Sequence, residues 1–530
     1  MNIHLISTIH FEKWYWANLD QGIGGSETHH IEIAWRLARR GHKVFSYAPV
    51  PWKGAKENRD VIWKRLEEAD YSAKGLWITY RCPELLDKFK KGQRVWLICQ
   101  DESYSTWTKE RAAKVERIIC LCQEHARNMA IGYPYLKEKI CVSSNGVRMD
   151  LIREVEKQKI ERNPKRMIYC SSPDRGLKQL VQIFNKVREF VPDIELVVTY
   201  GFNNINKLIK FSKSYGRYKK VRDELLEMMK APGIIWMGRV SQKELYKLHL
   251  SSGIWCYPTA FGETSCITCM EAQALGSIPI TNPYWALAEN VKHGTFIQGD
   301  NNDPLTQSRY TSEVIRLAMN PKLQEQIRKE MIPYSRYRFN WERWVDQLEG
   351  WAVGIDNPWY FCQYAFQLKH AKGKIINIGC DVDAPNFKAL GATNVDILKK
   401  TPILNTKTKA DIIADARDLP KSLYGKYDTA ILGEILEHYR DEDICTILKN
   451  AKKCLRKGGR IVITCPEDYR PTIEQHGVHT EPYSDTGSSM HEYPLTKEKL
   501  CTLIHMSGLT IDHSQIIDYT FALGIGIICS

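Results

Sequence analysis

The sequence predicts an α/β protein made of three successive units, each with a parallel sheet covered by helices. Strand-like apolar runs alternate with helical periodicity along most of the chain, and glycine-rich or polar loops follow the strands. The length supports several units, because 530 residues exceed the roughly 250–300 residues at which one core stops growing. We expect domains over residues 1–150, 151–356 and 357–530.

The first unit opens with an expected strand over 3–9, followed by a glycine-bearing loop and a helix from Ser26 that stops at Gly41. Apolar residues at Ile31, Ala34 and Leu37 have the spacing of one helix face. Short apolar runs predict the remaining strands of this unit over 44–47, 76–80, 95–99, 118–122 and 140–142.

The second unit is predicted to repeat this pattern, with strands over 167–170, 195–200 and 254–257. A helix follows the first of these strands from Leu177, and a basic, helix-prone segment runs up to Lys230. Ser241 and Glu244 form a capping box, which predicts a helix start. After a tryptophan-rich helix, the Asn357-Pro358 break precedes a third unit with expected strands over 374–378, 394–397, 429–432 and 460–464.

Composition excludes several classes of protein. Hydrophobic residues at 43% and charged residues at 26% are typical of a folded globular chain. No signal peptide and no apolar stretch of roughly 18–20 residues is apparent, and the 16 scattered cysteines suit a reducing environment, so we expect a cytoplasmic protein. The pair Cys266 and Cys269 has no partner pair for zinc and suits one helix face.

The net charge of +13 lies in the first 356 residues, because the rest carries 21 basic and 21 acidic residues. A field of this sign attracts anions, such as nucleotide phosphates, nucleic acid or an anionic membrane surface. No basic run with interleaved aromatic residues indicates a nucleic-acid module.

Two loops of the first 350 residues suit phosphate. Gly24-Gly25-Ser26-Glu27 joins a strand to a helix, so that backbone N–H groups and the helix dipole meet at one place. The same turn also fits a plain connection with Ser26 as N-cap. The loop over 171–178 places Arg175 and Lys178 at another helix start, where a guanidinium and an ammonium suit phosphate oxygens, although surface cations are commonly just solvated.

A third loop suits hydroxyl groups. Phe261-Gly262-Glu263-Thr264-Ser265 precedes an otherwise apolar helix that bears Glu271. Two carboxylates eight positions apart fit a loop residue and a helix residue that face one crevice, where they can accept hydrogen bonds from sugar and ribose hydroxyls. The alternative for Glu271 is an exposed helix face.

In order and spacing, these three motifs resemble glycosyltransferase family 4, a retaining group with the GT-B fold. The similarity covers about residues 1–350 and includes Gly41-His42-Lys43-Val44 and Ser144-Asn145-Gly146-Val147. It implies two Rossmann-like lobes, an acceptor lobe over 1–150 and a donor lobe over 151–356 with a helix that crosses back. It also implies a nucleotide-sugar donor between the lobes, a glycan-type acceptor and no metal.

The resemblance implies a role for each matched residue. Gly24 and Gly25 would contact the donor diphosphate, and Arg175 and Lys178 would neutralise it as it leaves. Glu271 would hold the ribose; the donor sugar would be held by Glu263 and the backbone amides of Thr264 and Ser265. Many relatives carry His-Asp where Gln100-Asp101 stands here, and Asp101 is the candidate contact to donor sugar or acceptor. Independently of the resemblance, His29, His30 and His125 are expected to be structural or surface groups rather than catalytic ones.

Residues 357–530 are similar to class I S-adenosylmethionine-dependent methyltransferases. The similarity rests on Asn377-Ile378-Gly379-Cys380, Asp396 at a strand end, the segment 414–420, Glu437-His438 and Leu455–Arg460. It implies a third Rossmann-like domain that binds S-adenosylmethionine. Gly379 would make room for the methionine part, Asp396 would bind the ribose, and Asp415 with the neighbouring Ala416 would bind the adenine edge.

The first loop departs from this family pattern, because Asp381 stands where a second glycine is usual. The carboxylates of Asp381 and Asp383 are expected to be solvated rather than metal ligands. His438 is the candidate base for methyl transfer. A loop-rich insert carries further histidines and is expected to cover the acceptor: His476, His479 and His491.

The sequence therefore predicts a bifunctional enzyme, a retaining glycosyltransferase fused to an O-methyltransferase that acts on a sugar hydroxyl. One alternative keeps the transferase and makes the last domain a non-catalytic S-adenosylmethionine sensor or a scaffold. The other is a glycosyltransferase that modifies nucleic acid, which the basic first part of the chain motivates.

Overall fold

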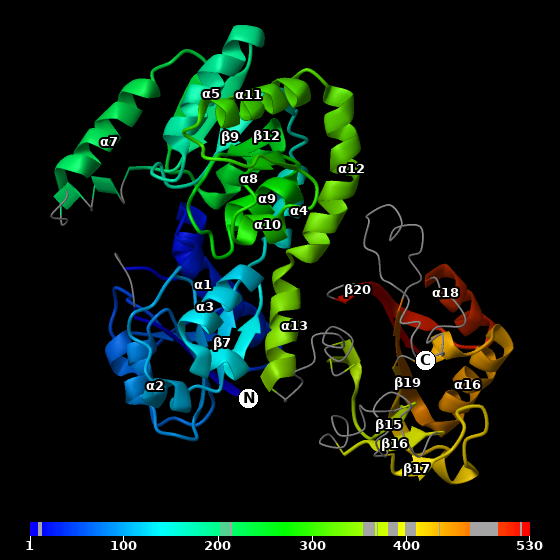
Figure 1. Cartoon of the computed structure of the whole chain (residues 1–530). Helices are drawn as coiled ribbons and strands as arrows, with labels where there is room; N and C mark the ends of the chain where they lie inside the picture. Colours follow the sequence, from blue (N-terminus) through cyan, green and yellow to red (C-terminus); the bar gives the residue numbers. More distant parts are fainter. Residues whose placement is uncertain are drawn as a thin grey trace. The chain divides into compact units, whose positions relative to one another are not determined.

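The computed structural model describes residues 1–8, 13–202, 205–206, 209–210, 215–352, 366–367, 369–379, 391–397, 410–433, 435–466, 495, 497–519 and 522–530. These residues form two compact units, Met1–Val345 and Asp346–Ser530 (Figure 1). The first unit contains two sheets and the second unit contains one. In the part of the chain that is described, no helix is long and apolar enough to cross a membrane.

The first sheet has eight strands in the order β3-β4-β2-β1-β5-β6-β7-β8, and every neighbouring pair is parallel except β3 with β4. Its central strands are apolar and buried along their whole length, as expected for a parallel sheet with helices on both faces. The strands are β1 (Asn2–Ser7), β2 (Lys43–Tyr47), β3 (Lys56–Asn58), β4 (Val61–Lys64), β5 (Leu76–Tyr80), β6 (Arg94–Ile98), β7 (Arg117–Cys120) and β8 (Ile140–Val142); the α-helices are α1 (Gly25–Arg39), α2 (Lys109–Lys114) and α3 (Gln123–Gly132).

The second sheet is wholly parallel, in the order β11-β10-β9-β12-β13-β14. Its strands are β9 (Asn163–Tyr169), β10 (Glu195–Thr199), β11 (Ile234–Gly238), β12 (Ser252–Tyr257), β13 (Ile278–Thr281) and β14 (Thr295–Phe296). Its helices are α4 (Met149–Glu156), α5 (Leu177–Phe190), α7 (Tyr215–Met228), α8 (Gln242–Ser251), α9 (Ile267–Leu275), α10 (Ala286–Asn290), α11 (Pro304–Ala318) and α12 (Pro321–Arg338). Figure 1 shows α12 beside this sheet, and the first residues of α13 (Trp341–Ala352) still belong to the first unit.

The start of α13 anchors the chain on the first sheet's helix layer. The rings of Trp341 and Trp344 lie edge-on to the imidazole of His29 in α1, with centroid distances of 5.5 and 4.9 Å. His29 and its neighbour His30 are fully buried, and burial lowers the pKa of each to about 3. Both rings are therefore neutral packing groups at neutral pH.

The second unit holds a seven-stranded sheet in the order β17-β16-β15-β18-β19-β21-β20, in which only the pairings of β21 are antiparallel. Its strands are β15 (Ile375–Ile378), β16 (Thr393–Asp396), β17 (Ile412–Ile413), β18 (Tyr427–Gly433), β19 (Leu455–Pro466), β20 (Ile511–Tyr519) and β21 (Ala522–Cys529). The α-helices α16 (Asp441–Cys454) and α18 (Lys497–Met506) pack on it.

Among the parallel strands, the order reverses at β1/β5 in the first sheet, at β9/β12 in the second and at β15/β18 in the third. Ligands of open α/β sheets bind outside the carboxyl ends of the strands at such switch points. The loops after β1, β9, β12 and β15 therefore lie where a ligand site is expected.

The structure corrects several details of the expected elements. Helix α1 begins at Gly25 rather than Ser26, because the N–H of Thr28 already donates to the carbonyl of Gly24 at 3.0 Å. Residue 9 of the first expected strand lies outside the described residues, and β1 ends at Ser7. Several strands escaped prediction: β3, β4, β11, β13, β14, β17, β20 and β21. Three of these have only two or three residues, too few for periodicity to appear.

Candidate functional site

A cavity of about 470 Å³ lies in the first unit, and loops from both of its sheets line it. The lining includes the loops after β1 and β6 of the first sheet and the loops after β9, β10, β11 and β12 of the second sheet. Eight of the sequence-predicted residues line this one cavity: Gly24, Gly25, Asp101, Arg175, Glu263, Thr264, Ser265 and Glu271.

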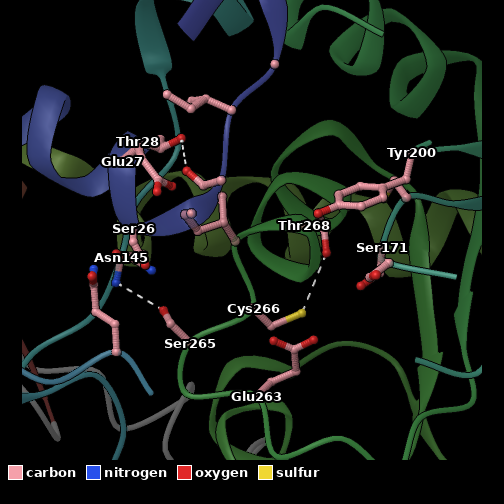
Figure 2. Close-up of a pocket in the computed structure, with 18 of the residues that line it drawn as sticks. Ser26, Glu27, Thr28, Asn145, Ser171, Tyr200, Glu263, Ser265, Cys266 and Thr268 are labelled. Carbon is pink, nitrogen blue, oxygen red and sulfur yellow. Dashed lines mark hydrogen bonds between the residues drawn. The ribbon is translucent and has the colours of Figure 1, made fainter. Parts of the chain in front are cut away.

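Two helix N-termini open onto this cavity. Helix α1 begins at Gly25, and α9 begins at Ile267 after Cys266, whose φ of 58° reverses the chain direction into the helix. Figure 2 shows Ser26, Glu27 and Thr28 of α1 across the cavity from Tyr200 and Ser171. The first-turn N–H groups and the positive ends of two helix dipoles make this region favourable for an anion.

Arg175 is a cation of the cavity wall that is held by a carboxylate and an aromatic ring. Its Nη1 lies 3.1 Å from Oε1 of Glu263, and its guanidinium stacks 3.7 Å from the ring centroid of Phe261. The same Oε1 accepts a hydrogen bond from the Tyr257 hydroxyl at 2.7 Å. Burial alone lowers the pKa of Arg175, but the charge of Glu263 outweighs it and raises the pKa above the usual value, so the guanidinium stays charged.

The loop after β12 holds the two sheets of the first unit together at the cavity. The Thr264 hydroxyl donates to the carbonyl of Gln100 at 3.2 Å. The backbone N–H of Asn145 donates to Oγ of Ser265 at 3.3 Å, a contact visible in Figure 2. Two hydroxyl side chains of the loop after β12 therefore contact the backbone of loops that follow strands of the first sheet.

Asp101 lies in the loop after β6 and is neutralised by Arg81. Nη2 of Arg81 lies 2.6 Å from Oδ1, and Nε lies 2.9 Å from Oδ2, so the pairing is bidentate. The Tyr104 hydroxyl accepts hydrogen bonds from the backbone N–H groups of Gln100 and Asp101, at 2.8 and 3.1 Å. The carboxylate is thus held in one orientation beside the cavity.

Glu271 is buried on the first turns of α9, which excludes the exposed helix face that its spacing also allowed. Oε1 of Glu271 accepts a hydrogen bond from Nε2 of Gln242 at 2.9 Å. Burial raises the pKa of Glu271 from 4.5 to about 7, although this hydrogen bond lowers it. The carboxyl group therefore titrates near neutral pH.

Lys178 is the one predicted residue of this set that does not line the cavity. It lies on the first turn of α5, and its Nζ pairs with Oε1 of Glu224 on α7 at 2.5 Å. Gly176, which precedes the helix, has a φ of 107°, and a Cβ there would meet the carbonyl oxygen of Pro258 at 2.0 Å. A glycine is therefore required to bring Arg175 next to the loop after β12.

Sequence reasoning missed three cavity residues that directly follow strands. Arg81 follows β5, Tyr200 follows β10 and Arg239 follows β11. Arg81 and Tyr200 have φ values of 62° and 80°, so the chain turns sharply at the strand end. The rule that residues at the carboxyl ends of parallel strands form the site could have found Arg81 and Tyr200, since one expected strand ended just before Arg81 and the other ended at Tyr200.

In the second unit, the expected cofactor residues also follow strands. Gly379 comes after β15 with a φ of 75°, and a Cβ there would meet Cδ1 of Ile435 at 2.5 Å. Asp396 ends β16 and is buried; Ala416 is also buried. The Asp415 carboxylate pairs with Nη2 of Arg417 at 2.7 Å and accepts the N–H of Arg417 at 2.8 Å, and this partner lowers the pKa of Asp415.

The remaining predicted residues of this unit are only partly described. His438 ends a 3-10 helix, Leu436–His438, that follows β18, but its side chain lies outside the description. Five other residues discussed above lie outside the described part of the chain: Asp381, Asp383, His476, His479 and His491.

In the first unit, two lobes built on mainly parallel sheets share one cavity lined by cations and carboxylates, an arrangement typical of the GT-B fold. Residues 152–332 match the family model described as "Glycosyl transferases group 1", so this part of the chain is a glycosyltransferase group 1 domain. The match supports glycosyltransferase activity and ends before the second unit. No curated protein matches the sequence.

Solved structures are similar to this chain in fold. Sucrose-phosphate synthase (tll1590) from Thermosynechococcus elongatus has 13% sequence identity and a TM-score of 0.50; the match covers 66% of this chain and 98% of that one. A glycosyltransferase from Rickettsia africae ESF-5 has 15% identity and a TM-score of 0.49, with coverage of 67% and 98%. Anabaena Alr3699/HepE, solved in complex with UDP and glucose, has 12% identity and a TM-score of 0.45, with coverage of 66% and 98%. At 13% identity, the similarity to sucrose-phosphate synthase shows the GT-B fold alone.

Proposed function

We propose that the first unit transfers a sugar, with retention, from a nucleotide-sugar donor to a glycan-type acceptor in the cavity between its two sheets. The observation that carries this proposal is that the Arg175 guanidinium, the Glu271 carboxyl group and two helix N-termini all face one cavity. Cations and backbone N–H groups suit a diphosphate, and a buried carboxylate suits a ribose diol.

The chemistry follows from where charge develops. When the bond between the sugar carbon and the phosphate oxygen breaks, the diphosphate takes the electron pair and gains negative charge. Arg175 lies in the cavity wall, and its charge is fixed before the reaction by Glu263 and the Phe261 ring. A cation that is already oriented stabilises a departing diphosphate without reorganisation, which is the largest single contribution in many enzymes.

The donor sugar is assigned to the loop after β12. Glu263 is buried, and one of its oxygens already accepts hydrogen bonds from Arg175 and Tyr257, so the other oxygen is the one offered to sugar hydroxyls. The backbone amides of Thr264 and Ser265 line the same cavity. Asp101 stands on the opposite side with Arg81 and is the candidate contact to the acceptor or donor sugar.

Thermal shift of the full chain with a panel of nucleoside diphosphates tests donor binding. A nucleotide at 100 times its Kd stabilises the folded state by about 2.7 kcal/mol, which raises Tm measurably. The variant Arg175→Met should lose most of this shift. Arg316→Met, which removes an exposed arginine of α11 paired with Glu313, is the matched control and should keep it. A panel that leaves the Tm of the wild type unchanged would contradict the proposal.

For the second unit we propose S-adenosylmethionine-dependent O-methylation of a sugar hydroxyl. Two observations of the sheet support a ligand site: the order of its first five strands reverses at β15/β18, and Gly379, Asp396 and Asp415 follow the neighbouring strands β15, β16 and β17. A Cβ on Gly379 would meet Cδ1 of Ile435 at 2.5 Å, so the turn after β15 requires a glycine, and the buried Asp396 suits a ribose diol. These residues therefore fit the cofactor.

When bound, S-adenosylmethionine supplies an electrophilic methyl group. The chain's own residues would then orient the acceptor hydroxyl and remove its proton, and His438 is the candidate base for that step. Gly379 would give room to the methionine part, and Asp415 with Ala416 would meet the adenine edge.

Calorimetry with S-adenosylmethionine separates this proposal from its alternatives. We expect binding to the full chain and its loss in Asp396→Ala, whereas Asp441→Ala on the surface of α16, paired with Lys499, should bind as the wild type does. Binding without methylation of any glycan product would favour a sensor. No binding at all would favour a scaffold.

A further inference from the structure

A chain of polar side chains, three buried and one half-buried, connects α1 of the first sheet to α9 of the second. Its members are Glu32 on α1, Arg148 in the segment that joins the sheets, Gln242 at the start of α8 and Glu271 on α9. Arg148 and Glu32 expose only 8% and 2% of their side chains. Burying such charges is unfavourable unless each is paired or hydrogen-bonded, so the partners of these residues determine what the arrangement can do.

Arg148 reaches Glu271 by two separate routes. Its Nη1 donates to Oε1 of Gln242 at 3.2 Å, and Nε2 of Gln242 donates to Oε1 of Glu271 at 2.9 Å. Its backbone N–H donates to the hydroxyl of Tyr246 at 3.1 Å, and this hydroxyl in turn hydrogen-bonds to Glu271. One residue therefore orients both groups that hold the carboxyl group.

The direction of the first route is fixed by chemistry. A guanidinium has donors only, so the atom of Gln242 that faces Arg148 must be the amide oxygen. The NH₂ group of Gln242 must then face Glu271 and can only donate to it. A carboxylate that accepts here is favoured over a neutral carboxyl group.

On its other side, Arg148 is fixed to the first sheet. Its Nε lies 3.4 Å from Oε1 of Glu32, whose second oxygen pairs with Arg36 on the next turn of α1. The neighbouring Val147 donates its backbone N–H to the carbonyl of Phe339 at 2.6 Å. Arg148 is thus held at the point where the chain passes between the two sheets.

We propose that Arg148 is a positioning residue for the donor. It holds the Glu271 carboxylate through Gln242 and Tyr246 in the orientation that accepts the ribose hydroxyls, and it ties that orientation to α1 through Glu32. This inference rests on the proposed role of Glu271 in donor binding.

The electrostatics of the site agree with this role. Burial raises the pKa of Glu271 to about 7, and hydrogen bonds from Gln242 and Tyr246 and the charge of Arg148 lower it. The Cys170 thiol, which directly follows β9, also interacts electrostatically with Glu271. Burial raises the pKa of this thiol and keeps it neutral. Without Arg148 the carboxyl group would be protonated over more of the neutral range.

The experiment uses Gln242→Leu in the full chain, because this variant breaks the first route and leaves the buried pair of Arg148 and Glu32 in place. Removing a hydrogen bond to a charged group weakens binding by about 10- to 100-fold. We expect a loss of this size in affinity for the stabilising nucleoside diphosphate at pH 7, a smaller loss at pH 8.5, and a raised donor KM with little change in kcat. Lys243→Met, one residue further on α8 with a surface pair to Glu154, is the control and should bind as the wild type does.

A measurement without ligand separates this inference from donor binding. In a double-mutant cycle on thermal unfolding, Gln242→Leu and Glu271→Gln should be non-additive at pH 8 and nearly additive at pH 5, where Glu271 is neutral. The double variant Arg148→Met/Glu32→Gln, which leaves no unpaired buried charge, should show the same coupling to Glu271→Gln. Additive effects at both pH values, or wild-type affinity in Gln242→Leu, would overturn the inference. A wild type that binds no nucleoside diphosphate but shows the pH-dependent coupling would instead contradict the proposed function.

Discussion

Replacing Arg175 with methionine removes a charge from the cavity wall while keeping most of the side-chain volume. Three contacts depend on this residue: the 3.1 Å pair with Glu263, the stacking 3.7 Å from the Phe261 ring centroid, and the proposed contact to the departing diphosphate. The first two are contacts of the folded protein, and the third exists only with substrate. Stability and catalysis should therefore respond separately.

The loss of stability should be modest. The Arg175 side chain is 32% exposed, so solvent screens the pair, and about 1–2 kcal/mol is expected from it. The cation–ring contact adds about 0.5–1 kcal/mol. Adding Glu263→Gln to Arg175→Met should recover part of this loss, because the buried carboxylate no longer lacks its counter-charge.

The loss of transfer should be much larger. Removing one fixed group that stabilises developing charge lowers kcat by about 100- to 1000-fold. The assay is initial-rate transfer with the nucleotide sugar that the wild type turns over, alongside thermal unfolding of each variant. Arg175→Lys keeps the charge but not the planar guanidinium or its stacking, so its kcat should lie between those of the wild type and Arg175→Met. A folded Arg175→Met protein with wild-type kcat would refute this reasoning.

Three further predictions concern stability. Because the folded-state pKa of Glu271 is raised from 4.5 to about 7, its stabilising contribution is present below pH 4.5 and is lost as the pH rises through 7. Glu271→Gln should therefore be more stable than the wild type by up to about 3 kcal/mol at pH 8, measured by thermal unfolding. Equal stability of the two proteins at pH 8 would contradict this prediction. Gly176→Ala should lower Tm by several degrees, because its Cβ would meet the Pro258 carbonyl at 2.0 Å; an unchanged Tm would show that the loop moves freely. The pKa values of His29 and His30 are lowered to about 3, so the stability that the two neutral rings contribute is present above pH 6.5. This stability is lost as the pH falls, by up to about 1.4 kcal/mol per pH unit for each ring. The double variant His29→Phe/His30→Phe should therefore lose less stability in acid than the wild type does.

The central strands and the loops after them could be predicted from the sequence because their determinants are local: buried parallel strands have continuous apolar runs, and ligands bind at the loops that follow them. That the loops with Gly25, Arg175 and Glu263 meet at one cavity was implied by the family resemblance and not by any local pattern. Very short strands such as β17 gave no such pattern.

The connections among the site residues could not be predicted, because they depend on tertiary packing. Nothing in the sequence near Arg148 indicates that it meets Glu32 of α1 and Gln242 of α8, which lie 116 positions before it and 94 positions after it. Lys178 shows the opposite case. Its spacing from Arg175 matches a family pattern, yet its Nζ pairs with Glu224 away from the cavity lining.

A crystal structure of the full chain with the nucleoside diphosphate that most raises its Tm would test the proposed donor site most directly. The phosphates are expected at the N-termini of α1 and α9 within hydrogen-bond distance of Arg175, with the ribose hydroxyls on Glu271. A nucleotide bound elsewhere, or phosphates that face away from Arg175, would contradict the assignment of this cavity as the donor site.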